Sequence, residues 1–163
     1  LGKDDTLVLS GSAPKKAADT LYADLAARME ARGTRCVIDA TGMLLTKALP
    51  YHPFLVKPNL EELEEIVGKK LDGLSAIEIA AQQMQQLGAR NVLVSLGGEG
   101  ALLIDEKGHA HHHRAPKGKV LNTVGAGDSM VAGFLAGTKR PVIMQRLSIG
   151  ASALAVPRPL QCI

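Results

Sequence analysis

Residues 122–137 limit the possible folds most strongly. This stretch begins polar and glycine-rich and then becomes apolar without a break, which is typical of a loop that leads into a helix. Gly125 and Gly127 can adopt backbone angles that a Cβ atom would forbid, so we expect the amides of Gly125, Ala126 and Gly127 to point into one space. A helix over roughly residues 128–137 would add its free N–H groups and the positive end of its dipole. The sequence therefore predicts a site for a phosphate-like anion.

Asp128 stands at the start of this predicted helix, and two roles fit it. The carboxylate can cap the helix by accepting first-turn N–H bonds. It can also act as a base beside the anion site, because phosphoryl transfer needs donors for the charge on the moving group and a carboxylate for the proton of the attacking hydroxyl. The spacing favours neither role over the other.

Composition predicts one soluble domain with a mainly aliphatic core, since the 163 residues are 46% apolar and include two Phe, two Tyr and no Trp. So few aromatic residues argue against a nucleic-acid binder, which stacks bases on aromatic rings. The net charge of +3 is small and the basic residues are scattered. Two cysteines without metal or disulfide spacing favour a reducing cytoplasm, and no long apolar span predicts a membrane segment.

Short apolar runs and helical stretches along the chain predict an α/β protein. The predicted strands are residues 6–10, 35–39, 54–57, 91–95 and 101–105. The predicted helices before the glycine-rich stretch are residues 15–32, 59–67 and 75–87, and one more is predicted after it at residues 141–156.

Polar residues lie at the carboxyl ends of the first two predicted strands. Ligands bind at the carboxyl ends of strands in an open α/β sheet, so Ser10, Gly11 and Ser12 are placed for contact with one. On pattern alone, a turn that ends the strand is the favoured interpretation. Asp39 could hold a ligand hydroxyl or a turn amide, and we favour the turn amide.

Asn59 and Glu62 have the spacing of a capping box, in which the two side chains satisfy each other's backbone donors at a helix start. Ser75 and Glu78 repeat this spacing and predict a second capping box. Lys57, at the end of a predicted strand, is either a phosphate contact or a solvated lysine.

Two further patterns have simple structural interpretations. Ser95 ends one predicted strand, and Gly97 and Gly100 follow it before the next strand, as expected for a glycine-containing hairpin turn. His109 and residues 111–113 form a histidine cluster. Adjacent strand residues point to opposite faces, and no carboxylate or thiol is expected to complete a metal set, so a solvated strand or loop is favoured.

The segment Thr123-Val-Gly-Ala-Gly-Asp128-Ser129 resembles the carboxy-terminal signature of the ribokinase/phosphofructokinase-B family of sugar kinases. The resemblance implies a ribokinase-like, Rossmann-like fold: an open, mostly parallel sheet with flanking helices. It also implies that Asp128 is the catalytic base at the substrate hydroxyl, that the amides of residues 125–127 form the anion hole, and that Thr123 contacts the nucleotide. Asn122 replaces the Asp of many members, which mildly favours the hexose-phosphate branch.

Other motifs extend the resemblance over about residues 7–153. The segment from Lys57 through Asn59 to Glu62 resembles the family's Asn-x-x-Glu motif, which implies a nucleotide contact for Lys57 and an indirect magnesium role for Asn59 and Glu62. Residues 95–100 resemble the loop along the nucleotide phosphates, which implies nucleotide contacts for Ser95, Gly97 and Gly100. Residues 10–14 resemble a sugar-phosphate loop, which implies substrate contacts for Gly11 and Ser12.

The resemblance implies ATP and Mg²⁺ as cofactors and a sugar phosphate as substrate, with fructose 1-phosphate expected and tagatose 6-phosphate and fructose 6-phosphate as alternatives. A homodimer of the full-length protein is also expected, without nucleic-acid or membrane partners. Family members are about twice as long. Residues 1–163 therefore look like the carboxy-terminal part of the kinase domain, without its amino-terminal part and lid, and a non-catalytic nucleotide-binding fragment is the alternative.

Other nucleotide-binding classes fit the sequence poorly. A dinucleotide-binding motif expects an acidic residue about 20 positions after its glycines to hold the ribose. The chain contains no Asp or Glu after Asp128. The Walker A pattern of P-loop enzymes is absent from the sequence as well.

Overall fold

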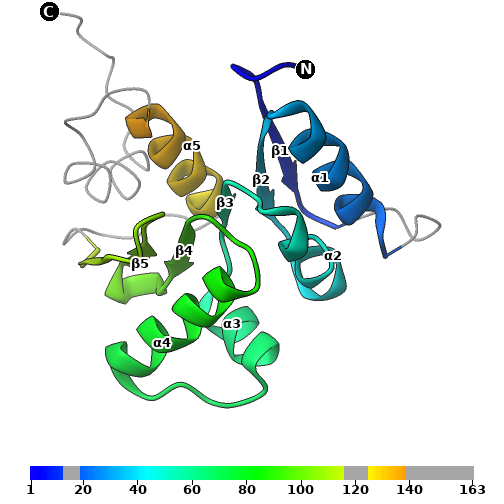
Figure 1. Ribbon diagram of the computed structural model, residues 1–163. Coiled ribbons are helices and arrows are strands. Elements are labelled where there is room, and N and C mark those ends of the chain that lie inside the picture. Colours follow the sequence, from blue (N-terminus) through cyan, green and yellow to red (C-terminus); the bar gives the residue numbers. More distant parts are fainter. Residues whose placement is uncertain (13–18, 116–124, 139–163) are drawn as a thin grey trace, which may run out of the picture. The chain divides into compact units, whose positions relative to one another are not determined.

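A computed structural model describes residues 1–12, 19–115 and 125–138 of the chain. The chain divides into two compact units. The first consists of residues 1–96 and 102–112, and the second of residues 97–101 and 113–163. Helices α1 to α4 belong to the first unit, whereas α5 belongs to the second (Figure 1).

In the part of the chain that the structure describes, six strands form one sheet whose order follows the chain, β1-β2-β3-β4-β5-β6. The strands are β1 (Thr6–Ser10), β2 (Arg35–Asp39), β3 (Leu55–Val56), β4 (Val92–Ser95), β5 (Ala101–Ile104) and β6 (Ala110–His113). Strands β1 to β4 pair in parallel. The connections from β4 to β5 and from β5 to β6 are short, as antiparallel neighbours require, so the sheet is mixed. The predicted α/β class with a mostly parallel sheet is confirmed.

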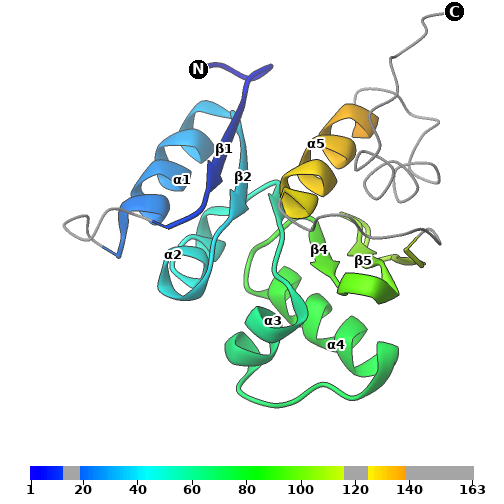
Figure 2. The ribbon, with the colours of Figure 1, turned by 180° about the vertical axis from the view of Figure 1, so that it is seen from behind.

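The helices are α1 (Leu21–Arg32), α2 (Gly42–Thr46), α3 (Leu60–Val67), α4 (Gly73–Gln86) and α5 (Ala126–Thr138), with short 3-10 helices η1 (Leu49–Tyr51) and η2 (Gly97–Glu99). Both ribbon views show α1 running alongside β1 and β2, while α3 and α4 lie side by side near β4 (Figure 2). These helices bring their apolar faces to the sheet of the first unit.

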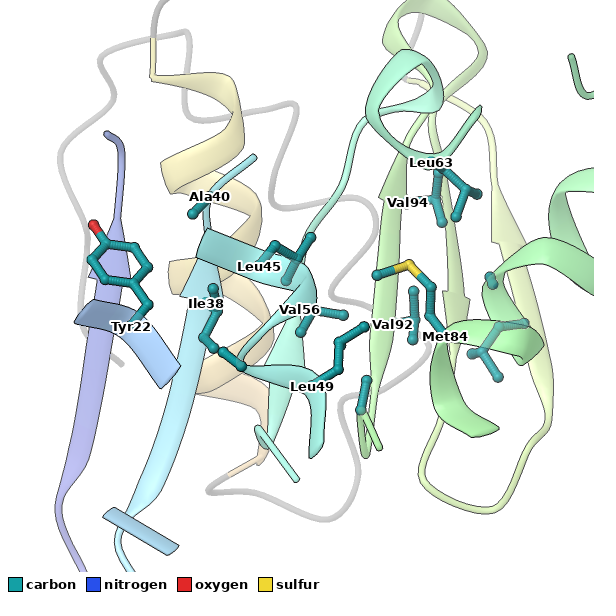
Figure 3. Packing of buried hydrophobic residues seen from close by; sticks show 14 of the residues in the cluster. Tyr22, Ile38, Ala40, Leu45, Leu49, Val56, Leu63, Met84, Val92 and Val94 are labelled. Carbon is teal, nitrogen blue, oxygen red and sulfur yellow. The ribbon is translucent and has the colours of Figure 1, made fainter. Parts of the chain in front are cut away.

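The core of the first unit is aliphatic, as the composition predicts. Ile38, Val56 and Val92 are fully buried, and the strand register places each beside the next in neighbouring parallel strands. Leu63 of α3 and Met84 of α4 pack into the same cluster (Figure 3). Each such side chain contributes about 1.5–3 kcal/mol by leaving water. This packing holds the strand ends in place.

Helix α1 starts later than predicted. The sequence predicts a helix from residue 15, but residues 19 and 20 form a turn and α1 begins at Leu21; residues 15–18 lie outside the described residues. The Lys- and Ala-rich run favours helix throughout, so propensity alone does not mark the start. The end is as predicted, because Gly33 closes the helix in the left-handed conformation with a φ of 68°.

The second predicted capping box is wrong. Helix α4 begins at Gly73 with Asp72 before it, so Ser75 and Glu78 lie inside the helix. The earlier start follows from the segment that precedes the helix. Leu71 is buried, and its amide donates to Glu64 Oε1 at 2.9 Å, which fixes the chain just before Asp72.

Candidate functional site

The residues that follow the parallel strands lie along one edge of the sheet. Three backbone hydrogen bonds continue the ladders at this edge: Gly11 N–H to Asp39 O at 2.9 Å, Lys57 N–H to Ile38 O at 3.2 Å, and Ser95 N–H to Pro58 O at 3.0 Å. A parallel bridge also joins Asn59 and Ser95. The structure thus brings Gly11, Lys57, Asn59 and Ser95 of the predicted site to the carboxyl edge of the sheet, where ligands of open α/β proteins bind.

The end of β1 is a turn whose side chains remain open to solvent. Gly11 has a φ of 81°, a conformation that favours glycine, which supports the turn interpretation. The hydroxyl of Tyr22, in α1, donates to the carbonyl of Ser10 at 3.0 Å and so fixes the turn to the helix. Ser10, Gly11 and Ser12 are all exposed, so the turn leaves them accessible to a ligand.

Lys57 and Asp39 form an ion pair that the sequence analysis does not anticipate. Lys57 Nζ lies 3.1 Å from Asp39 Oδ1, and their side chains are 9% and 19% exposed. Lys57 is therefore not a solvated lysine, and the Asp39 side chain pairs with an ammonium instead of serving only a turn. Each residue comes at the end of one of two neighbouring parallel strands, and it is the pairing of these strands that brings the two side chains together.

Asn59 and Glu62 form the predicted capping box at the start of α3. Asn59 Oδ1 accepts from the Glu62 amide at 2.8 Å, and Glu62 Oε2 accepts from the Asn59 amide at 2.8 Å. The capping interpretation is confirmed. One carboxylate oxygen of Glu62 is engaged in this way, and an indirect role toward magnesium stays a prediction.

In the second unit, the glycine-containing loop is a 3-10 turn and not a simple hairpin turn. Gly97 begins η2 with a φ of 56° and is exposed. Gly100 is buried with a φ of 101°, and a Cβ atom on it would lie 1.9 Å from the carbonyl oxygen of His113. Close backbone packing therefore explains Gly100 without any ligand.

The start of α5 presents backbone donors in the predicted region. The first hydrogen bond of the helix runs from Ser129 N–H to Gly125 O at 2.9 Å. The amides of Ala126, Gly127 and Asp128 precede it and have no acceptor within the helix. Gly125 has a φ of 78°, as predicted, but Gly127 lies inside the helix and needs no glycine-specific backbone angle. Ala126 and Gly127 are thus among the helical donors, and the anion hole of residues 125–127 stays a prediction.

Asp128 is exposed and belongs to the first turn of α5. Gly125, and not Asp128, occupies the capping position, since its carbonyl accepts the first helical bond. A carboxylate in the first turn is favoured by the helix dipole. This arrangement can bind an anion at the backbone donors and take up a proton beside it. Thr123, the predicted nucleotide contact, and Asn122 lie outside the described residues.

The histidine cluster has a carboxylate partner. Asp105 Oδ2 lies 3.0 Å from His111 Nε2 and 3.3 Å from His109 Nδ1, at the turn between β5 and β6. The sequence missed this because the hairpin register decides which side chains meet. Over the described ranges, no group of three or more His, Cys, Asp or Glu residues has an arrangement that could hold a metal ion.

Comparisons with known proteins agree on one family. Residues 1–154 match the sequence profile described as "pfkB family carbohydrate kinase". The chain is 37% identical over 145 residues to a 1-phosphofructokinase of Bacillus subtilis, which covers 89% of this chain and 48% of that protein. It is 40% identical over 136 residues to a 1-phosphofructokinase of Haemophilus influenzae, covering 83% of this chain and 44% of that protein.

Solved structures show the same likeness. The structure of phosphofructokinase-2 from Escherichia coli, in complex with substrates and products, has a TM-score of 0.82 and 33% sequence identity to this chain. The match covers 91% of this chain and 48% of the phosphofructokinase-2 chain. Ribokinase from Arabidopsis thaliana has a TM-score of 0.75 at 23% identity, which shows the shared fold alone. The chain spans about half the length of the curated relatives it matches. From its sequence and its fold, this chain belongs to the pfkB family of carbohydrate kinases.

Proposed function

We propose that this chain is the carboxy-terminal part of the kinase domain of an ATP-dependent sugar-phosphate kinase. The reaction moves the γ-phosphoryl group of ATP to the 6-hydroxyl of fructose 1-phosphate and yields fructose 1,6-bisphosphate and ADP. Asp128 takes the proton of the attacking hydroxyl, and the backbone donors at the start of α5 stabilise the charge of the transferring group. The observation that carries the proposal is the exposed Asp128 carboxylate in the first turn of that helix.

The strand-end edge of the first unit supports a nucleotide role. Lys57 offers a cation, and Ser95 and Asn59 offer polar groups. Mg²⁺ usually retains several waters and is held by one or two carboxylates together with substrate phosphates. Glu62, half-buried beside Asn59, fits such a water-mediated role, and the ion would neutralise phosphate charge when bound.

Fructose 1-phosphate is the proposed substrate because two of the relatives are 1-phosphofructokinases at 37% and 40% identity. Tagatose 6-phosphate and fructose 6-phosphate are the alternatives within the family. A coupled ADP-release assay of the full-length protein with the three sugar phosphates ranks them. A homodimer is proposed for the full-length protein, and sedimentation velocity checks it.

Asp128→Asn in the full-length protein tests the base assignment. Asparagine keeps the size of the side chain but cannot accept the proton, so kcat is expected to fall by about 10²-fold or more while ATP still binds. Asp72→Asn is the matched control, because Asp72 is exposed at the start of α4 and makes no side-chain capping bond. Normal turnover by Asp128→Asn would exclude Asp128 as the base.

The alternative is a nucleotide-binding fragment without turnover, and the chain spans 48% of its Bacillus subtilis relative. ADP release by residues 1–163 alone, with ATP, Mg²⁺ and fructose 1-phosphate, separates the two possibilities. ATP binding without ADP release would support the fragment, whereas turnover would support a catalytic chain.

A further inference from the structure

The Lys57–Asp39 ion pair has a specific place in the sheet. Strands β2 and β3 pair Val37 with Leu55 and Ile38 with Val56, so Asp39 and Lys57 are the next partners along the same register. Side chains alternate between the faces of a sheet, so Asp39 shares a face with Val37, and Lys57 with Leu55. The main core cluster includes Ile38 and Val56 but neither Val37 nor Leu55. The pair therefore lies on the face opposite that cluster, at the carboxyl edge.

Burial makes the pair unusual. Lysine side chains are rarely buried unless they are paired, because removing an ammonium from water is very unfavourable. Lys57 as a whole is 7% exposed, and its Nζ lies 3.1 Å from Asp39 Oδ1. A buried ion pair is by itself weak evidence for a role in stability, since apolar side chains of similar volume often stabilise a protein as well or better. The placement at the strand ends therefore points to a role in the site.

We propose that Asp39 is a positioning residue, which holds the Lys57 ammonium at the carboxyl edge of the sheet so that it can receive a nucleotide phosphate. This inference rests on the proposed function. An ammonium has three N–H donors, so it can contact a carboxylate and a phosphate oxygen together. A free lysine side chain would also lose rotamer entropy on binding, and the pair with Asp39 removes much of that loss in advance.

A double-mutant cycle on ATP affinity tests the inference in the full-length protein. Asp39→Asn keeps an oxygen acceptor but removes the charge, and Lys57→Met keeps the length of the stem but removes the ammonium. If Asp39 acts through Lys57, each single variant weakens ATP binding by about tenfold, the effect of one lost charge-assisted contact. The double variant should then bind ATP no more weakly than Lys57→Met alone. Calorimetric titration with ATP and Mg²⁺ measures all four proteins.

The double variant keeps the test valid if Asp39→Asn fails to fold, which could happen because the buried Lys57 ammonium would then have no partner. It carries no charge at either position, so comparing it with Lys57→Met still shows whether Asp39 acts alone. Equal affinities support positioning through Lys57. A further loss in the double variant means that Asp39 acts directly on the ligand or its magnesium ion, and the inference is overturned.

Two comparisons separate this inference from the proposed function. Lys70→Met is the control for removal of a surface cation, because the Lys70 side chain is 89% exposed in its pair with Glu64, and its ATP affinity should match the wild type. If the wild-type full-length protein neither binds ATP nor releases ADP, the proposed function fails and the inference with it. If the wild type is active but the effects of Asp39→Asn and Lys57→Met multiply, the inference alone fails.

Discussion

At the residue scale, Asp105 shows how one carboxylate can organise a turn. Its Oδ1 accepts from the amides of Lys107 and His109, both at 2.9 Å, while Oδ2 faces the two histidine rings. Its carbonyl accepts from Gln85 Nε2 at 2.7 Å, which ties the turn to the end of α4. The histidines that look like a metal motif in the sequence therefore support the β5–β6 hairpin.

This geometry predicts a dependence of stability on acid pH. Partial burial alone would raise the pKa of the Asp105 carboxyl, but hydrogen bonds from His111 and from the amides of His109 and Lys107 lower it from 3.8 to about 2. The ionised Asp105 carboxylate therefore contributes to the free energy of unfolding above about pH 4. This contribution is lost as the pH falls through the folded-state pKa, because the unfolded state binds the proton first. Urea unfolding between pH 5 and pH 2, at roughly half-unit steps, measures the free energy of unfolding.

The Asp105→Asn variant provides the comparison for that prediction. It cannot ionise at position 105, so its free energy of unfolding should fall less steeply between about pH 4 and pH 2 than that of the wild type. Asp72→Asn, whose native side chain makes no capping hydrogen bond, should keep the wild-type slope. Identical slopes for all three proteins would contradict the role given to Asp105.

Replacing Gly100 or Gly98 by alanine should affect the free energy of unfolding very differently, although both glycines lie in the same loop. Gly100→Ala places a Cβ atom 1.9 Å from the His113 carbonyl oxygen at a φ of +101°, so we expect a loss of more than about 1 kcal/mol in the free energy of unfolding. Gly98→Ala meets no atom within 4 Å and should change stability by less than about 0.5 kcal/mol. Equal melting temperatures for the two variants would argue against the close packing of Gly100.

At the element scale, the start of α3 combines a structural role with a proposed functional one. Asn59→Ala removes the cap and is expected to lower stability by about 1 kcal/mol. Glu62→Gln keeps an oxygen for the Asn59 amide, so the helix should stay as stable while the charge near the proposed magnesium is lost. ADP release by the full-length Glu62→Gln variant should then need more Mg²⁺. An unchanged Mg²⁺ requirement would leave Glu62 as a capping residue only.

The sequence predicts the positions of the strands better than it predicts which side chains contact each other. Strands β2, β4 and β5 lie within one residue of their predicted bounds, because short buried apolar runs have a strong signal. The starts of α1 and α4 were missed, since helix propensity continues beyond the true ends and a capping pattern can occur inside a helix. The Lys57–Asp39 pair depends on which strands are neighbours, and the contact of Asp105 with His111 depends on hairpin register, neither of which follows from local sequence.

At the scale of the whole molecule, burial in the core of the first unit predicts where substitutions destabilise the fold. Met84 is fully buried and Ile79, on the same helix, is 55% exposed. Met84→Ala should lower the free energy of unfolding by about 2–5 kcal/mol, because it removes packed atoms and leaves a cavity. Ile79→Ala should change it by less than about 1 kcal/mol, since little area is lost and alanine favours helix. Urea denaturation measures both, and similar losses would contradict this assignment of the core.

The order of the strands in the sheet equals their order in the chain. During synthesis, each of the six described strands can therefore add to the strand made just before it. Sequential assembly of this kind keeps short the loops that must close between these strands.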